Sequence, residues 1–170
     1  MVVKELNKAS GVWSMKSQFS AKSQGTWPKF LIPANYLVVA GGGSGAPQGG
    51  GAGGAGGFRL IACTIDTGCY AVVIGAGATG QGGPAHPVSP GEQPGNQGTP
   101  SSINCISATG GGGGVFRNVA PICKGNGGSG GGGDRASPAA VASNGNAGGY
   151  TPVEGYPGGR STPASDTPSG

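Results

Sequence analysis

The 170-residue chain is long enough for one domain, but its composition excludes most folds built on an apolar core. It holds 41 glycines and 14 prolines, and Leu, Ile, Val and Phe fall below the roughly 20% that an ordinary core needs. Only 9% of the residues are charged, so the high net charge typical of disorder is also missing. We therefore expect neither a helical or Rossmann-like enzyme nor plain disorder, and no cofactor.

The formal charge of +4 comes from residues 1–30, which contain five lysines and one acidic residue, Glu5. The net charge of residues 31–170 is zero. Five lysines without arginine are too few for a nucleic-acid footprint, so we expect a solvated or partner-facing basic surface and no nucleic acid. The longest apolar run, Tyr36–Ala40, is too short to span a bilayer, and the N-terminus lacks the apolar region of a secretory signal. These features predict a chain made in a cytoplasm, with no membrane insertion.

Residues 10–25 are predicted to form a helix. Ser10 is suited to cap its N-terminus and Gly25 to end it, while Val12, Met15 and Phe19 follow the spacing of one helix face. Both tryptophans of the chain lie near its ends. We interpret residues 1–30 as an attachment segment, with four candidate partner-docking residues: Trp13, Met15, Phe19 and Trp27. The alternative is a local mini-core, although so short a segment seldom folds alone.

From residue 31 onward, short β-prone runs alternate with glycine. The predicted strands are Asn35–Ala40, Phe58–Thr64, Cys69–Ile74, Ser102–Ala108 and Val115–Ile122. Phe58–Ile65 and Cys69–Ile74 are predicted to pair as a hairpin with a turn near Thr67 and Gly68. These runs would form a small all-β scaffold.

The glycine-rich segments between them are 41–57, 75–83, 110–114, 125–133, 144–149 and 155–159. Glycines recur at every third position, which is the turn of a polyproline-II helix; the longest series is Gly42, Gly45, Gln48, Gly51, Gly54 and Gly57. The sequence therefore predicts a mainly β and irregular fold, in which a glycine-rich polyproline-II bundle extends from a small β scaffold and follows a short N-terminal helical anchor. Inward-facing glycines of such a bundle should tolerate no side chain, because the backbones approach closely.

The cysteines are Cys63, Cys69, Cys105 and Cys123, whose spacing does not match a zinc site, and the chain has one histidine, His86. In the predicted hairpin Cys63 and Cys69 would face each other and could form a disulfide, with Cys105 and Cys123 as the second pair. Three pairings exist for four cysteines, and small buried thiols are an equally good interpretation. No structural metal is expected.

Residues 70–80 combine a strand with the G-x-G-x-x-G spacing of a dinucleotide site. That site needs a helix opening at the glycines and an acid about 20 residues later. Here prolines follow instead, at Pro84 and Pro87, and the only acid nearby is Glu92. With no Walker A lysine and no credible catalytic triad, we expect neither nucleotide binding nor enzyme activity.

Four motifs in order give the sequence a family resemblance: YLVVAGGG at 36–43, GGAGGFR at 53–59, YAVVIGAG at 70–77 and SATGGGGG at 107–114. They resemble the glycine-rich domain of phage tail-fibre, adhesin and other virion structural proteins over about residues 35–149. GVWSMK at 11–16 and GTWP at 25–28 also resemble a lead-in segment of phage virion proteins. The resemblance implies a virion location, docking to other virion proteins through residues 1–30, and a domain at 31–170 whose loops touch a host-surface receptor. Four cysteines and the proline-rich stretches 84–100 and 150–170 depart from the pattern.

The longest candidate receptor loop is Gln81–Ser101, with the polar residues His86, Glu92, Gln93, Asn96 and Gln97. The alternative is that this loop merely caps the glycine bundle. Two functions remain open: a fibre or adhesin subunit that recognises a host surface, and a head or tail decoration or joining protein without a receptor. A homotrimer fits either function, although no heptad repeat supports it. An ice-binding bundle fits less well, because 84–100 interrupts a regular face.

Overall fold

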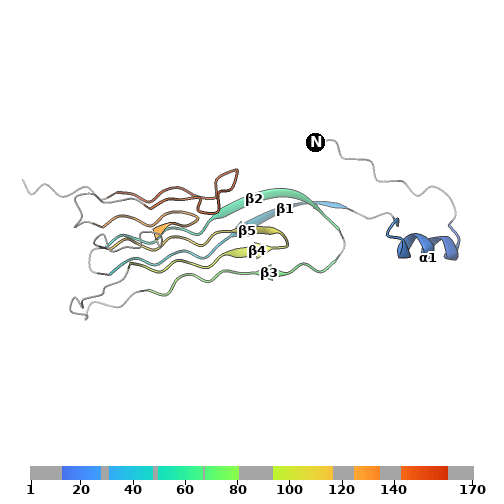
Figure 1. The fold of residues 1–170 in the computed structure, drawn as a ribbon, viewed down its shortest axis with the longest axis horizontal. Coiled ribbons are helices and arrows are strands. Elements are labelled where there is room, and N and C mark those ends of the chain that lie inside the picture. The colour runs from blue at the N-terminus through green and yellow to red at the C-terminus, as the bar shows by residue number, and fades with distance from the viewer. Residues whose placement is uncertain are drawn as a thin grey trace, which may run out of the picture. The chain divides into compact units, whose positions relative to one another are not determined.

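The computed structural model describes residues 13–27, 31–47, 50–66, 68–80, 94–116, 125–134 and 143–160 (Figure 1). The chain divides into two compact units. The first comprises Met1–Asn35 and Ala62–Cys69, and the second comprises Tyr36–Ile61 and Tyr70–Gly170. The described residues are mainly strands and irregular segments with one short helix near the N-terminus, which confirms the predicted fold class.

The helix α1 spans Met15–Ser23 in the first unit. Its N-cap is Ser14, whose Oγ accepts a hydrogen bond of 3.2 Å from the N–H of Ser17. The prediction that Ser10 caps the helix was therefore wrong, while the residues before 13 lie outside the described part. The predicted end at Gly25 is confirmed, because Gly25 follows the C-cap Gln24 with φ +67°, a conformation that glycine adopts without strain.

The five strands are β1 (Ile32–Val39), β2 (Phe58–Ile65), β3 (Val72–Val73), β4 (Ser101–Ile103) and β5 (Ile106–Ala108). β1 pairs with β2, and β3, β4 and β5 form a second sheet in that order. Both pairs of the second sheet are antiparallel, with Val72 opposite Ile103 and Ser101 opposite Ala108. The division between the two units falls inside β1 and β2.

The predicted hairpin of Phe58–Ile65 with Cys69–Ile74 was wrong. β2 pairs with β1 because the chain between them folds back on itself, with the N–H of Ala46 bonded to the carbonyl of Gly51 at 2.9 Å. β3 is left to pair with β4. The strand-like run Ser102–Ala108 is itself a hairpin, since Asn104 turns the chain with φ 53°, a region that asparagine tolerates better than most residues.

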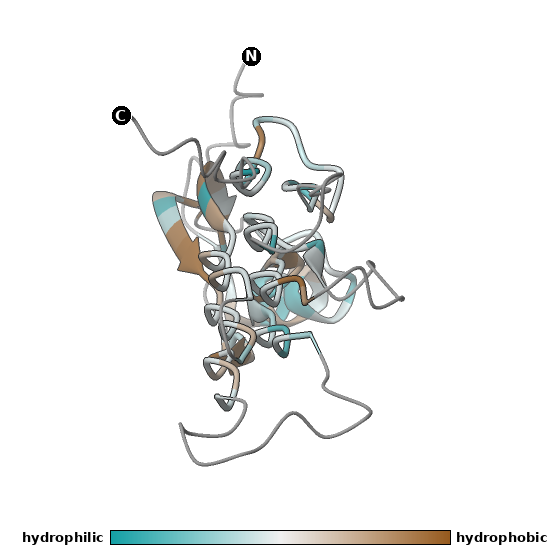
Figure 2. Cartoon of the chain, turned by 90° about the vertical axis from the view of Figure 1, so that its left-hand side faces the viewer, coloured by the Kyte–Doolittle hydropathy of each residue, from teal (hydrophilic) through white to brown (hydrophobic). Residues whose placement is uncertain are grey.

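Glycine segments continue the strands as hydrogen-bonded extended chains with a repeat of three residues. Every third N–H of the segment 40–46 donates to the antiparallel segment 51–57: Ala40 to Gly57, Gly43 to Gly54, and Ala46 to Gly51. The N–H groups of Gly41 and Ser44 donate to a different segment, at Thr99 and Asn96. Successive residues therefore face different neighbours, as in a polyproline-II helix. The end-on view of Figure 2 shows the segments as separate tight spirals.

Residues 110–114 form the centre of this bundle, and all of 110–116 is buried. Four surrounding segments, 41–45, 51–57, 94–98 and 128–129, hydrogen-bond to this run. Apolar burial in the second unit is limited to Val38, Ala40, Ile106, Ala108, Val115 and Phe116 among the described residues. Figure 2 shows the strongest apolar colouring on the strands rather than along the glycine segments. Backbone hydrogen bonds, rather than a large apolar core, thus order the bundle.

The close approach of the segments explains the glycines. A Cβ on any residue from Gly110 to Gly114 would overlap a carbonyl oxygen of a neighbouring segment. The prediction that inward-facing glycines tolerate no side chain is therefore confirmed, and the structure shows which glycines these are. Gly42 and Gly45 have ordinary room, with the nearest atoms 3.7 and 3.6 Å from an added Cβ, whereas Gly43 would meet the carbonyl oxygen of Gly112.

A buried carboxylate fastens the segment 143–160 to the bundle. Glu154 is 2% exposed, and its Oε2 accepts a hydrogen bond of 2.8 Å from the N–H of Thr109. Its Oε1 accepts one of 3.2 Å from the N–H of Gly148, and its own N–H donates to Oδ1 of Asn146. The backbone carbonyl of Glu154 also accepts from the N–H of Phe58 at the start of β2. One residue therefore joins three parts of the second unit.

Ser143 is a buried polar residue whose hydrogen bonding can be tested by mutation. Its side chain is fully buried and its hydroxyl has no hydrogen-bond partner in the structure. We expect Ser143→Ala to raise the free energy of unfolding by about 1 kcal/mol, because a desolvated hydroxyl without a partner destabilises the fold. Chemical denaturation measures the change.

The matched control is Ser101→Ala. Ser101 is also buried, but its Oγ accepts a hydrogen bond of 2.9 Å from the N–H of Gly75, so its loss should lower stability by about 1–2 kcal/mol. A loss of stability in Ser143→Ala equal to that of the control would show that the Ser143 hydroxyl is hydrogen-bonded.

Candidate functional site

The bundle brings several chain connections to one end of the second unit. Hydrogen bonds at this level join Gly51 to Val115, Gly95 to Gly114, Val115 to Gly132 and Gly133 to Gly159, with N···O distances of 2.8–3.0 Å. The connections 81–93, 117–124 and 135–142 start or finish within a few residues of these bonds, as do the 46–51 turn and the stretch 161–170. We call the described residues that flank these connections the loop end: Pro47, Gly50, Gly80, Pro94, Phe116, Gly125, Asp134, Ser143 and Arg160.

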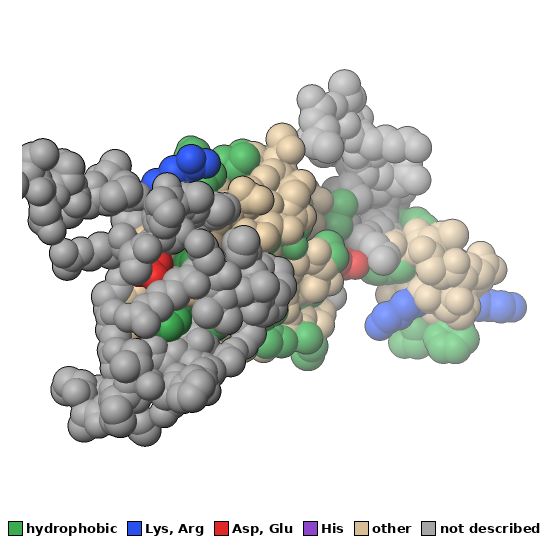
Figure 3. Space-filling model, turned by 60° about the vertical axis from the view of Figure 1, so that its left-hand side comes forward, with side chains coloured by type: hydrophobic (Ala, Val, Ile, Leu, Met, Phe, Trp, Pro, Cys, Tyr) green, Lys and Arg blue, Asp and Glu red, His purple; other side chains and the backbone are tan. Residues whose placement is uncertain are grey.

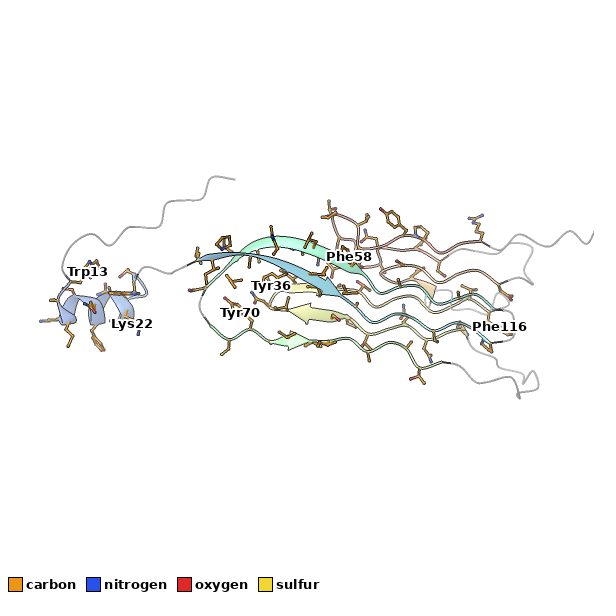
Figure 4. All side chains as sticks on the ribbon, turned by 180° about the vertical axis from the view of Figure 1, so that it is seen from behind. Trp13, Lys22, Tyr36, Phe58, Tyr70 and Phe116 are labelled. Atoms are coloured by element: carbon orange, nitrogen blue, oxygen red, sulfur yellow. The ribbon has the colours of Figure 1, made fainter. Side chains whose placement is uncertain are left out.

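The base of the loop end is rigidly packed. Phe116 is 3% exposed and lies at this end of the bundle in Figure 4. A Cβ on Gly50 would come within 3.2 Å of the Phe116 ring, so Gly50 lies against that ring. Asp134 is also buried. Connections that leave this end therefore start from fixed positions, which is the usual setting of a binding surface made of loops.

The predicted receptor loop is only partly a loop. Asn96 and Gln97 belong to a bundle segment, because their neighbours Gly95 and Gly98 are hydrogen-bonded to Gly114 and Gly111. The side-chain amide of Asn96 donates to the carbonyl of Thr79 at 3.1 Å, and that of Gln97 donates to the carbonyl of Asn126 at 2.5 Å. Both amides therefore tie segments together. The other three predicted residues, His86, Glu92 and Gln93, lie outside the described residues.

Most of the charged residues of 31–170 lie, in the sequence, within or next to these connections, a distribution that the sequence analysis did not use. Residues 31–170 hold ten charged residues, and seven of them lie in these connections, in 161–170 or one residue away: Glu92, Arg117, Lys124, Asp134, Arg135, Arg160 and Asp166. The signal was present in the sequence, since Arg117, Lys124 and Arg135 each lie within three residues of the end of a glycine segment. This distribution of charge could not be interpreted from the sequence, because only the hydrogen bonds between segments show that the ends of those segments lie close together.

The four predicted partner-docking residues lie on or beside α1, in the first unit. Trp13, labelled in Figure 4, contacts Trp27 edge to face, with ring centroids 5.7 Å apart, so the two rings form a small local contact. Each remains more than one third exposed. Met15 and Phe19 are 87% and 77% exposed, and Ala21 is the only buried residue of α1. A groove of about 460 Å³ runs along the helix, lined by Trp13, Lys16, Ser17, Ser20, Ala21 and Gln24 among others.

Cys63, Cys69 and Cys105 are free thiols in the structure, so the predicted disulfide between Cys63 and Cys69 is not formed there. The hairpin that was expected to bring these two residues face to face is also absent, because β2 pairs with β1. Cys63 is half-buried, whereas Cys69 and Cys105 are exposed. Cys123 lies outside the described residues.

The dinucleotide-like run 75–80 has the geometry of a bundle segment. The carbonyl of Ala76 accepts from the N–H of Thr99 at 3.0 Å, and the N–H of Ala78 donates to Gly42 at 2.8 Å, so no helix opens at these glycines. Among the described residues, no group of three or more His, Cys, Asp or Glu side chains could hold a metal ion. Within the same ranges, no helix has the length and apolar character needed to cross a membrane.

Comparison with known proteins gives one match. The family model described as a glycine-rich domain matches residues 20–170, which begins inside α1 and includes the whole second unit. No curated protein matches, and no solved structure matches.

Proposed function

The chain belongs to the glycine-rich domain family, and we propose that it is a phage virion structural protein, a fibre or adhesin subunit that recognises a host surface. Residues 1–30 dock it to other virion proteins, and the second unit presents the loop end to a receptor. The observation that carries the proposal is that the chain connections gather at one rigid end of the bundle. A surface of this kind can vary in sequence without changing the hydrogen-bonded segments behind it.

The first unit supports the docking half of the proposal. Met15 and Phe19 are four residues apart and therefore neighbours on the α1 surface, and both are almost fully exposed. An exposed apolar pair on a short helix fits an apolar groove on a partner protein. Lys16 and Lys22 would add contacts to an acidic rim around that groove.

A second function, a decoration or joining protein of the virion head or tail, is favoured by the roles of Asn96 and Gln97. Both amides are used to tie bundle segments together rather than to face a ligand. A bundle held in this way can serve as a rigid spacer with no receptor.

Immunogold electron microscopy of purified phage particles, with an antibody against residues 31–170, distinguishes these functions. We expect label at fibre or tail tips. Label over the head or tail shaft would favour the decoration role, and particles without label would contradict a virion protein altogether.

Adsorption of particles that carry loop variants tests receptor contact directly. We expect the triple change His86→Ala, Glu92→Gln and Gln93→Ala to lower adsorption at least tenfold or to alter host range, with the melting temperature nearly unchanged. The matched control is Cys105→Ser, an exposed residue in the turn between β4 and β5, which leaves the loop end intact and should adsorb normally. Normal adsorption of the triple variant would contradict the assignment of these three residues to receptor contact.

A further inference from the structure

Two asparagines of the second unit are followed directly by glycine: Asn126 in the segment 125–133 and Asn144 in the segment 143–160. Asparagine is one of the thermolabile side chains of proteins. A glycine after it leaves the next backbone nitrogen accessible, because glycine has no Cβ and few limits on φ and ψ. That nitrogen can attack the side-chain amide carbon of the asparagine. The two dipeptides are identical in sequence, so a difference in reactivity between them comes from the fold.

The fold holds the link between Asn126 and Gly127 in place. Oδ1 of Asn126 accepts a hydrogen bond of 2.8 Å from the N–H of Asn144, and the N–H of Gly127 donates to the carbonyl of Asn144 at 3.2 Å. Gly127 is buried, and a Cβ on it would overlap the backbone nitrogen of Gly112. The side-chain amide and the following N–H are therefore both engaged. Attack within this link requires both hydrogen bonds to break before the reacting atoms can align.

The link between Asn144 and Gly145 is open. Asn144 is exposed, and within the described part of the chain its side chain makes no hydrogen bond. The N–H of Gly145 likewise donates to no backbone carbonyl of the described residues. The two groups that are fixed at Asn126 are thus both available at Asn144. Its amide carbon can turn toward the nitrogen of Gly145 without the loss of a hydrogen bond.

We propose that Asn144 is a site of spontaneous deamidation, and that this modification loosens the segment 143–160. The backbone nitrogen of Gly145 forms a bond to Cγ of Asn144, and the proton of that nitrogen leaves with the side-chain NH2 as ammonia. Water then adds to either carbonyl of the resulting cyclic imide and opens it to aspartate or isoaspartate. Water is the only co-reactant, and nothing is oxidised or reduced.

Isoaspartate does not fit the hydrogen bonds on the two sides of Gly145. Both neighbours of this glycine, Asn144 and Asn146, are hydrogen-bonded to the segment 125–133. Gly145 itself has no spare room, because a Cβ on it would overlap the backbone of Tyr156. Isoaspartate adds a methylene group to the main chain at this point. The bonds of Asn144 and Asn146 can then no longer be kept together.

The loosening spreads through Asn146. Its Oδ1 accepts hydrogen bonds of 3.1 and 3.3 Å from the N–H groups of Tyr150 and Glu154, and its Nδ2 donates to the carbonyl of Tyr150 at 3.1 Å. Displacement of Asn146 therefore disturbs Glu154, which fastens the segment to the bundle.

Both products also place a carboxylate next to Ser143, a residue of the loop end. Figure 3 shows few charged side chains among the described residues on the face that it presents. Residues 31–170 have no net charge, so the modification gives this part of the chain a net negative charge.

Ageing of the full chain at mildly alkaline pH, followed by digestion and mass spectrometry, tests the proposal. Replacement of NH2 by OH raises the mass of the modified peptide, and an isoaspartyl methyltransferase identifies isoaspartate. In the folded chain we expect modification of Asn144 to be at least about tenfold faster than that of Asn126, because Asn126 must first break two hydrogen bonds. The control is the same chain in urea, where the two dipeptides are equivalent and should react at similar rates.

Asn144→Gln is the matched variant, since glutamine would need a larger imide ring and the exposed side chain has no hydrogen bond to lose. After ageing, we expect the denaturation midpoint of the wild-type chain to shift downward and that of Asn144→Gln to stay constant. An unmodified Asn144 in the folded chain, or equal rates at Asn126 and Asn144 there, would overturn the proposed site. Modification of Asn144 without a shift of the midpoint would overturn the loosening of the segment 143–160.

Discussion

Gly112→Val will prevent cooperative folding of the second unit, or lower its free energy of unfolding by at least about 4 kcal/mol. A Cβ at this position overlaps the carbonyl oxygen of Gly125 and approaches the N–H of Gly131, and both atoms belong to backbone that is itself hydrogen-bonded. Relief of the overlap would separate segments joined by bonds such as the 3.0 Å contact from the N–H of Gly112 to Ser129. Gly54→Val should behave similarly, because its Cβ would overlap the carbonyl oxygen of Ser129.

Two single alanine substitutions, at the adjacent glycines Gly42 and Gly43, provide the sharpest control. Gly43→Ala places a methyl group on the carbonyl of Gly112, whereas Gly42→Ala meets one atom at 3.7 Å, an ordinary contact. Both changes remove the same unfolded-state freedom, so any difference in stability reflects the bundle alone. We expect a large loss for Gly43→Ala and no loss for Gly42→Ala, measured by thermal melting and chemical denaturation. Equal stabilities would contradict the close-packed bundle.

Glu154→Ala will lower the free energy of unfolding of the second unit by about 3 kcal/mol. The change removes two hydrogen bonds to a carboxylate and leaves the N–H groups of Thr109 and Gly148 without their acceptors. Hydrogen bonds to charged groups contribute about 1.5–3 kcal/mol each, and a donor left unpaired next to a cavity adds to the loss. Chemical denaturation of the full chain measures the effect.

Glu154→Gln is the matched variant, since it keeps the shape of the side chain and one acceptor oxygen. We expect a smaller loss, because the amide NH2 replaces the second acceptor and faces an N–H donor. A change of less than about 0.5 kcal/mol in Glu154→Ala would show that the segment 143–160 is held mainly by its backbone bonds, such as that from the N–H of Gly130 to Tyr156.

Several local features of this protein were predictable from the sequence because they depend on neighbouring residues. Gly25 ends α1 since glycine adopts a positive φ without strain, and the β-prone runs at 35–40 and 58–64 form strands. The period of three in the glycines predicted extended segments that pack by their backbones.

The candidate site was less predictable. The single-loop hypothesis at 81–101 assigned Asn96 and Gln97 to a receptor surface, yet these residues tie bundle segments together. Residues 117–122 were assigned to the predicted strand Val115–Ile122 and lie outside the described residues, and 135–142 was assigned to no element, because neither stretch carries a recognisable loop motif. Their shared end is visible only from hydrogen bonds between residues far apart in the chain, such as that from Val115 to Gly132.

The sequence by itself thus determined the class of fold: extended, glycine-dependent and poor in apolar core. Only the tertiary structure decided which strand pairs with which, which glycines face inward, and where the loops gather. The physical reason is that polyproline-II segments make no internal hydrogen bonds. Gly41, Gly42 and Gly43 are chemically identical, and only the backbone segments that surround each of them decide which can accept a side chain.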